Sequence, residues 1–387
     1  MSSQRISLPL SAAGRAAALC LLWSLAFVCF AANAQDSGNI VYHDAASSSL
    51  KRTNTLGSFS QSLTHPPAGY TDESASWSPT GRSVVFERRQ GARDETYDGQ
   101  DRQIVVVDRM GRRERVIATG FAPVWSGWSP NRIAFVGWPY MNIPELQCVY
   151  TIHHDGTGLQ LLSCVEQLGP TMPWCTTGVH TCYQKYRKLA WSRDGRYVIA
   201  HVATFVINHA DPTDQFWMYT LWRTRVSDRA QARVPNSPDA IDPIDFSMAA
   251  GNTLYYGALE QAEAGVDTPV IHRVNFITGA GARVAEGSLP IVSPDATGFA
   301  FTAPQGANRH GRLYYANADG SGAQLLAGPT TTARVAPLDW SRDGSHILLQ
   351  RSEAGLNSLH LVTLTGAWRT VRRNAVAEAG AWHQAPP

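Results

Sequence analysis

A short motif that joins a Trp or an aliphatic residue to a tight turn recurs along most of the chain. Its turns use Pro and Gly, which preset the backbone for a reversal, and Asp, which bonds its own backbone. Each turn is followed by a β-branched run, a second apolar run and a polar Asp-Gly-type turn. The clearest copies are SWSPTG (76–81), GWSPN (127–131), AWSRDG (190–195), VSPDATG (292–298) and DWSRDG (339–344).

The spacing of these copies predicts a β-propeller. A unit of about 40 to 50 residues with four short strands is typical of a propeller blade. The Trp is expected to end the innermost strand and to fill the wedge between blades, where a large flat side chain buries the most apolar area. A β-sandwich with coincidental turns is the alternative. It is disfavoured because the turn copies stay in register with two hydrophobic runs each, such as SVVF (83–86) and QIVVVD (103–108).

The two ends of the chain hold complementary parts of one further repeat. Residues 39–63 match a blade that lacks its innermost strand, and residues 377–384 match that missing strand. Pairing them would close the ring and remove an exposed sheet edge. The sequence therefore predicts an all-β, seven-bladed propeller, with six blades as second choice because the 243–286 copy lacks the Trp and the Ser-Pro turn. The predicted innermost-strand markers are Trp77, Trp128, Trp191, Phe246, Val292, Trp340 and Trp382.

The WSPTG, WSRDG and ADGSGAQLL units resemble the propeller repeats of the TolB family of bacterial periplasmic proteins. The resemblance covers nearly the whole chain after the leader and implies a propeller, whereas a fold does not imply a function. TolB carries an α/β domain ahead of its propeller, and no helical stretch of that size precedes the first strand here. A role like that of TolB in partner binding is therefore not carried over.

The N-terminus has the pattern of a secretory leader. Arg5 and Arg15 precede the apolar run 16–30, and Ala32-Asn33-Ala34 supplies small residues for cleavage. The run is shorter than a membrane-spanning helix, which needs about 20 residues. We expect a signal peptide at 1–34, a single propeller domain at 35–387, and a periplasmic or secreted protein without a membrane anchor.

The charge balance gives no electrostatic reason for nucleic-acid binding. The full chain has 33 Lys and Arg against 31 Asp and Glu, and removal of the leader with its two arginines makes the numbers equal. A neutral surface does not attract nucleic acid or anionic lipid. We expect a monomer that binds a protein or a glycan.

Four cysteines follow the leader, and an even number in an oxidising compartment favours disulfides. Cys148 and Cys164 lie at equal distances from Gly156, the centre of a predicted hairpin, so they should face each other. The remaining pair is Cys175 with Cys182. A four-thiolate zinc site is the alternative, disfavoured because no Cys-x-x-Cys pair is present.

The longest insertions are expected on one face of the ring. In a propeller, the loops between second and third strands emerge on the same face as those that lead to the next blade. By that rule one face, over blades two to four, should carry 88–102, 137–147, 163–188 and 204–216. Loops on a rigid scaffold commonly hold binding sites.

These insertions supply candidate metal ligands and aromatic residues that could bind a ligand. The alternative for the aromatic residues is that they pack an insertion onto its blade. No cofactor is predicted; the weak candidates for a divalent metal are His209, Asp211 and Asp214, and loop spacing alone fixes no geometry. The acidic run 94–101 lacks the spacing of a calcium loop. The predicted ligand-binding residues are Trp138, Tyr140, Trp174, Tyr183 and Phe216.

Two hypotheses for function remain. The first and favoured one is a non-catalytic scaffold that binds a protein or glycan on the insertion-rich face. The second is a polysaccharide lyase that performs β-elimination on a uronic-acid glycan, with His180, His209 and Tyr183 as the catalytic residues; it depends on analogy with lyases of the same fold. No Gly-x-Ser-x-Gly, phosphate-loop or His-Glu-x-x-His motif is present.

Overall fold

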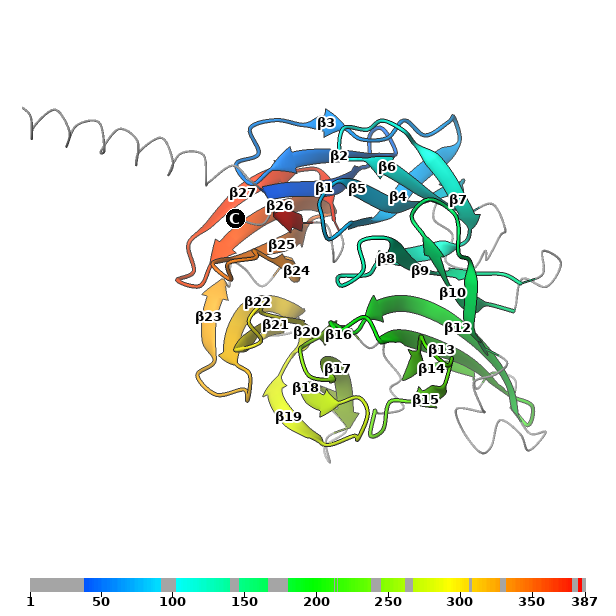
Figure 1. Cartoon of the computed structure of the whole chain (residues 1–387). Coiled ribbons are helices and arrows are strands. Elements are labelled where there is room, and N and C mark those ends of the chain that lie inside the picture. Colours follow the sequence, from blue (N-terminus) through cyan, green and yellow to red (C-terminus); the bar gives the residue numbers. More distant parts are fainter. Residues whose placement is uncertain are drawn as a thin grey trace, which may run out of the picture.

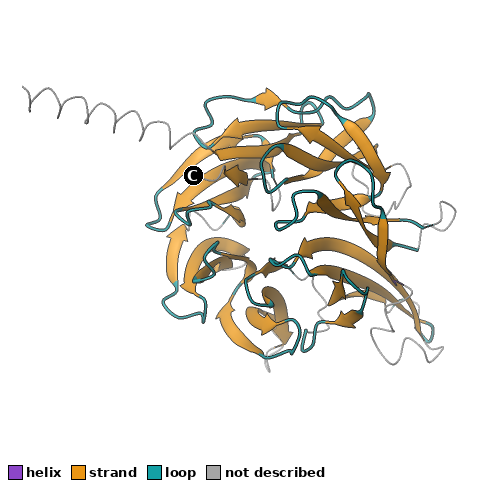
Figure 2. Cartoon of the chain, viewed as in Figure 1, coloured by secondary structure: helices purple, strands orange, loops and turns teal. Residues whose placement is uncertain are grey.

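The computed structural model describes most of the chain as strands and turns arranged in a ring (Figures 1 and 2). No helix in this described part is long and apolar enough to cross a membrane. Seven antiparallel sheets surround one axis, which confirms the seven-bladed propeller. The described residues are 38–91, 102–139, 146–165, 180–211, 213, 215–237, 245–261, 267–305, 308–327, 332–377 and 382–384.

Each sheet is one blade, and its strands follow in chain order from the axis outwards in blades two to seven. Blades two to four comprise β4 (Tyr70–Trp77), β5 (Ser83–Gln90), β6 (Arg102–Asp108) and β7 (Arg115–Thr119); β8 (Phe121–Trp125), β9 (Arg132–Gly137), β10 (Cys148–His153) and β11 (Gln160–Cys164); and β12 (His180–Trp191), β13 (Tyr197–Asn208), β14 (Gln215–Arg225) and β15 (Gln231–Arg233).

Blades five to seven repeat the same order. They comprise β16 (Phe246–Met248), β17 (Thr253–Gln261), β18 (Asp267–Asn275) and β19 (Gly281–Glu286); β20 (Ser288–Val292), β21 (Gly298–Gln305), β22 (Asn308–Asn317) and β23 (Gln324–Ala327); and β24 (Arg334–Trp340), β25 (His346–Glu353), β26 (Leu356–Thr363) and β27 (Trp368–Arg373).

Blade one joins the two ends of the chain, as predicted. Its strands β1 (Gly38–Asp44), β2 (Ser49–Asn54) and β3 (Gln61–Ser62) come from the N-terminal side. The innermost position is taken by β28 (Ala375–Val376) and β29 (Trp382–Gln384), which both pair with β1. Ile40 lies opposite Trp382 in this pairing. The ring is therefore closed by hydrogen bonds between segments far apart in sequence.

The cross-strand register corrects two of the seven predicted markers. In six blades the residue after the innermost strand donates its backbone N–H across the turn, as Ser192 does to Tyr197 and Ser126 to Arg132. This rule places Trp125, not Trp128, at the strand end of blade three. WSGWSPN contains the Trp-Ser pair twice, and only the second copy precedes Pro. Trp128 lies in the turn and is 73% exposed.

In blade five the same rule places Met248 at the strand end, because Ala249 donates to Thr253. The predicted marker, Phe246, lies two residues earlier and is also buried. Met248 lies opposite Leu254, as Trp191 lies opposite Val198. The predicted marker therefore lies on the innermost strand but two residues before its end, because this blade has no Trp-Ser or Ser-Pro step to set its register. The marker set in the structure is Trp77, Trp125, Trp191, Met248, Val292, Trp340 and Trp382.

Each marker side chain packs against the blade that precedes its own. Trp125 belongs to a buried cluster with Val85 and Ile104 of blade two. Trp191 clusters with residues of blade three, and its indole nitrogen donates to the carbonyl of Val124 at 3.1 Å. One flat side chain therefore supplies both apolar burial and a directional bond between neighbouring blades.

Cys148 and Cys164 form the predicted disulfide. They are direct cross-strand partners in β10 and β11, with Cα atoms 4.0 Å apart. Cys182 is also disulfide-bonded, and its predicted partner Cys175 lies outside the described residues.

The two Trp residues of the blade-three turn provide a matched test of the corrected register. Trp125→Ala should lower the free energy of unfolding by about 3–5 kcal/mol, because it empties a buried wedge. Trp128→Ala should change it by less than about 0.5 kcal/mol, because the side chain is exposed. Denaturant unfolding of both variants measures the difference. A larger loss for Trp128→Ala would contradict the assignment.

Candidate functional site

The insertion-rich face is described only in part. The segments 92–101, 140–145 and 166–179 lie outside the described residues, and so do 212 and 214. Among the predicted site residues, Tyr140, Trp174 and Asp214 therefore lie outside the described residues, and His180 is described by its backbone pairing alone.

Blade four carries the largest described feature of this face. Its strands β12, β13 and β14 have 12, 12 and 11 residues, against 5, 6 and 6 in β8, β9 and β10 of blade three. Parts of 163–188 and 204–216, expected as loops, are extensions of these strands. The run ATFVIN (203–208) is rich in β-branched and aromatic residues, which favour a strand.

The register separates two of the predicted aromatic residues. Tyr183 lies opposite Phe205, which lies opposite Trp217, so these three side chains share one face of the sheet. Phe216 lies opposite Val206 and projects from the other face. The structure therefore does not bring Tyr183 and Phe216 together.

We call Tyr183, Phe205 and Trp217 the aromatic row. The rings of Phe205 and Trp217 have centroids 4.8 Å apart, and Tyr183 is 46% exposed at the end of the row on β12. The prediction missed Phe205 and Trp217. The sequence shows that both residues are aromatic and lie on neighbouring predicted strands. This identifies them as members of a row only once the cross-strand pairing is known.

Trp138 directly follows β9 on blade three. It is half-buried and packs against Phe121, with ring centroids 5.5 Å apart. The guanidinium of Arg102, at the start of β6 in blade two, lies 5.1 Å from the Phe121 ring. The contact between Trp138 and Phe121 holds the start of the predicted 137–147 insertion onto blade three.

Basic residues of β12 surround the aromatic row. Arg187 has its guanidinium carbon 5.2 Å from the centre of the Trp217 ring. Lys188 lies 3.8 Å from Asp245. Below them His201 is buried, and its pKa is lowered to about 3, first by burial and then by the charges of Lys188 and Arg187. Arg187 and Lys188 therefore lie close enough to His201 to disfavour its protonation.

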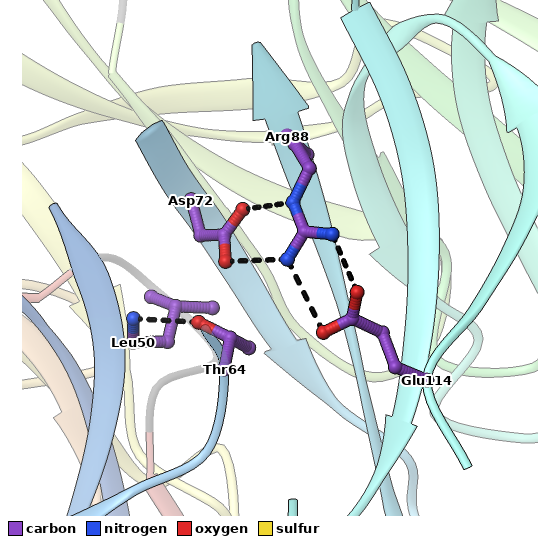
Figure 3. A network of polar contacts seen from close by, with 5 residues as sticks. All are labelled: Leu50, Thr64, Asp72, Arg88 and Glu114. Carbon is purple, nitrogen blue, oxygen red and sulfur yellow. Dashed lines mark hydrogen bonds and ion pairs between the residues drawn. The ribbon is translucent and has the colours of Figure 1, made fainter. Parts of the chain in front are cut away.

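A second group of charged residues is buried in blade two (Figure 3). Arg88 donates to both oxygens of Asp72, at 2.6 and 2.9 Å, and also to Glu114. Burial alone would lower the pKa of Arg88, and the hydrogen bonds to Asp72 and Glu114 outweigh it, so this pKa is raised. Asp72 and Arg88 are almost fully buried.

Further ion pairs extend this group towards blade three. Arg89 lies 2.6 Å from Glu73, and Arg102 lies 3.3 Å from Glu87. Glu87 also accepts a hydrogen bond from the backbone of Ala122 in blade three. Each of these carboxylates is matched by an arginine, so the arrangement neutralises charge and links blades.

One hydroxyl–imidazole contact lies at the start of β20. The Oγ atom of Ser288 is 2.9 Å from Nδ1 of His310, and Oγ1 of Thr302 is 3.2 Å from the same nitrogen. The two hydroxyls lie 3.1 Å from each other. Ser288 is therefore held in a shared hydrogen-bond cluster, which fixes β20 against β21 and β22.

The candidate metal ligands do not form a cluster in the described part of the chain, where no group of three His, Cys, Asp or Glu is placed to hold a metal ion. His209 and Asp211 lie exposed in the β13–β14 turn. The Asp211 carboxylate accepts hydrogen bonds from the backbone and hydroxyl of Thr213, at 3.0 and 2.6 Å.

Comparison with known proteins yields structural similarity alone. No protein-family model matches the chain, and no curated protein matches it in sequence. Among solved structures, an oligogalacturonate lyase in complex with manganese is similar over 88% of this chain and 86% of that one, with a TM-score of 0.56 and 11% identity. At this identity the likeness shows the fold.

Two peptidases are similar over slightly less than half of their own length. Prolyl oligopeptidase B from Galerina marginata matches 87% of this chain and 48% of its own, with a TM-score of 0.55 and 11% identity. Acylaminoacyl peptidase from Pyrococcus horikoshii matches 75% and 44%, with a TM-score of 0.52 and 14% identity. The chain therefore spans about half the length of these peptidases.

The buried arginine of blade two predicts a large effect of one substitution. Asp72→Ala should lower the free energy of unfolding by about 3–5 kcal/mol, because it leaves Arg88 buried without its main partner. Glu286→Ala, which breaks an exposed pair with Arg283, should cost less than about 1 kcal/mol. Denaturant unfolding measures both. Equal losses would show that the Asp72 pair is not a structural link.

Proposed function

We propose that the chain is a non-catalytic scaffold that binds a protein or a glycan through the insertion-rich face of blades two to four. The observation that carries the proposal is the aromatic row on the extended strands of blade four. Tyr183 exposes a large aromatic surface there, and aromatic residues bury much apolar area at low conformational cost when a ligand covers them.

The extension of blade four is not needed to close the ring. Blade three forms a complete four-stranded sheet with strands about half as long. Long strands hold side chains more rigidly than loops do, and rigid presentation reduces the entropy that binding must offset. These features support recognition as the purpose of the extension.

The lyase is the second candidate, and one observation favours it. His180 and Asn208 are cross-strand partners, so His180 and His209 belong to the same tip of the β12–β13 pair. An imidazole there would take the proton next to a uronate carboxylate while the glycosidic oxygen leaves. A divalent cation with His209, Asp211 and Asp214 as ligands belongs to this second proposal.

The TolB-like assignment and the periplasmic or secreted location are also parts of the proposal. The Cys148–Cys164 disulfide supports an oxidising compartment, because such bonds are rare in the reducing cytosol. The signal peptide at 1–34 and the cleavage that would release the domain at 35–387 can be tested by the intact mass of the exported protein.

Replacement of two members of the aromatic row tests the binding function. We expect the Tyr183→Ala, Trp217→Ala double variant to bind its ligand at least about tenfold more weakly, a loss of about 1.4 kcal/mol or more. A panel of glycans and candidate proteins, screened with the unaltered protein, supplies the ligand. The double variant should bind more weakly because it lacks the aromatic stacking surface. Calorimetry or surface plasmon resonance measures the affinity.

The control variant is Trp368→Ala, which removes a partly exposed Trp from β27 of blade seven and should leave affinity unchanged. An ultraviolet-absorbing unsaturated product formed from a polyuronide, and lost in His180→Ala or His209→Ala, would overturn the non-catalytic proposal. Unchanged affinity in the double variant would show that the ligand does not bind to the aromatic row of blade four.

A further inference from the structure

Exposed apolar side chains gather on the face of the ring opposite the insertions, at the turns of blades one to three. We call these turns and the residues next to them the turn surface, which comprises 55–60, 78–82, 109–116, 126–131 and 154–159. Of the ten large apolar side chains that are exposed in the described part of the chain, six belong to it: Leu56, Phe59, Met110, Val116, Trp128 and Leu159. Such a concentration on one side marks a contact surface.

Blade two adds unpaired positive charge to the turn surface. The two turns of this blade touch, because the backbone N–H of Arg109 donates to the carbonyl of Arg82 at 2.9 Å. Asp108 accepts two backbone hydrogen bonds that fix the β6–β7 turn, and Glu114 accepts hydrogen bonds from the buried Arg88. Within the described residues, no ion pair is formed by four exposed arginines of these turns, Arg82, Arg109, Arg112 and Arg113.

Hydrogen bonds join the arginine-rich turn to the exposed Trp of blade three. Arg115 donates to the carbonyl of His154 at 2.6 Å. The backbone N–H of His154 donates in turn to the carbonyl of Asn131, at 2.8 Å, in the turn that carries Trp128. The most exposed large apolar side chain of the described chain, Trp128, is therefore held in the same surface as the arginines.

Blade one is joined to the same turn by side-chain packing. The guanidinium carbon of Arg52 lies 5.5 Å from the centre of the Phe59 ring, and Nη2 of Arg52 lies 3.6 Å from Sδ of Met110. A Cβ atom at Gly111 would lie 2.8 Å from the carbonyl oxygen of Leu63 in blade one, so only Gly allows this close approach. The turn is therefore packed against its neighbour, and its arginines and Met110 are presented together.

The neutral total charge of the chain does not describe this surface. The full chain has 33 Lys and Arg against 31 Asp and Glu, but salt limits the reach of exposed charges to about 10 Å. An approaching anion therefore responds to the arginines of blade two. The turns of blades one and three beside them hold one acid, Asp155, whose carboxylate accepts hydrogen bonds from Thr157. The turn surface is thus locally positive as well as apolar.

We propose that the turn surface binds an anionic lipid bilayer, with its arginines on lipid phosphates and with Met110 and Trp128 at the level of the headgroups. Arginines and apolar side chains alternate within single turns, whereas the core of a protein interface is depleted of charge. Turns at the same end of neighbouring blades can meet a flat surface together. Trp is enriched at membrane–water interfaces, and a guanidinium can donate two hydrogen bonds to a phosphate.

Co-sedimentation of the full chain with lipid vesicles tests the proposal. One kind of vesicle is made of phosphatidylcholine alone, and the other of phosphatidylcholine mixed with the anionic lipid phosphatidylglycerol. At low salt the protein should bind the mixed vesicles at least about tenfold more strongly, because each arginine near an anionic surface strengthens binding about fivefold. The preference should shrink at high salt, because screening weakens exposed ionic contacts.

Two triple variants with the same change in total charge locate the contact. The first removes arginines of the turn surface: Arg109→Gln, Arg112→Gln and Arg113→Gln. It should bind the mixed vesicles at least about tenfold more weakly. The control removes exposed arginines of blades four and five: Arg196→Gln, Arg229→Gln and Arg273→Gln. It should change binding less than about twofold, because charges away from the contact are screened. Trp128→Ala should also weaken binding to the mixed vesicles, since it removes the interfacial Trp.

All variants keep the same N-terminal residues, so the apolar run 16–30 cannot cause a difference between them. Equal binding of the two kinds of vesicle, or equal losses in the two triple variants, would overturn the proposal. Binding of polyglutamate without binding of either vesicle would assign the surface to an acidic protein and would also overturn it. Tyr183→Ala, Trp217→Ala should bind vesicles like the unaltered protein, because the aromatic row lies on the other face. This result separates the proposal from the proposed binding function.

Discussion

The contact that every other part of the structure depends on is the wedge between neighbouring blades. The side chain at the end of each innermost strand packs on the blade before it, so the seven sheets form a cyclic series of interfaces. Blade one is assembled from both ends of the chain. Trp382 therefore completes the interface with blade seven, in a cluster with Leu348 and Leu359. A cyclic series has no weak terminal repeat, which an open array must cap.

Turn chemistry predicted the number of blades more reliably than it predicted their register. Pro, Gly and Asp steps identify a reversal wherever they occur, and five clear copies were enough to set the repeat. Register needs one more constraint, because a shift along the strand changes which side chain enters the wedge. Blade three offers two Trp-Ser pairs three residues apart, and blade five offers none. The hydrogen bonds across the turns supply that constraint, and they select Trp125 and Met248.

The candidate site was less predictable because it depends on pairing between strands. The sequence pointed to the insertions of blade four, and to Tyr183 among their aromatic residues, whereas Phe205 and Trp217 lie 22 and 34 residues later along the chain. Only the β12–β13–β14 register places them beside Tyr183. The same register sends Phe216 to the opposite face, since neighbours along a strand project in opposite directions. Residue type and loop position could not separate these two cases.

Two clusters of charged and aromatic residues, one in blade two and one in blade four, show that an arginine can have different structural roles. In blade two, Arg88 is buried and donates four hydrogen bonds to Asp72 and Glu114, so its charge is neutralised within the protein. In blade four, Arg187 is exposed and lies over an aromatic ring. Burial with complete pairing fixes a fold, because breaking such a pair is costly. An exposed arginine on long strands does not stabilise the fold in this way, and its position on blade four therefore supports a role in recognition.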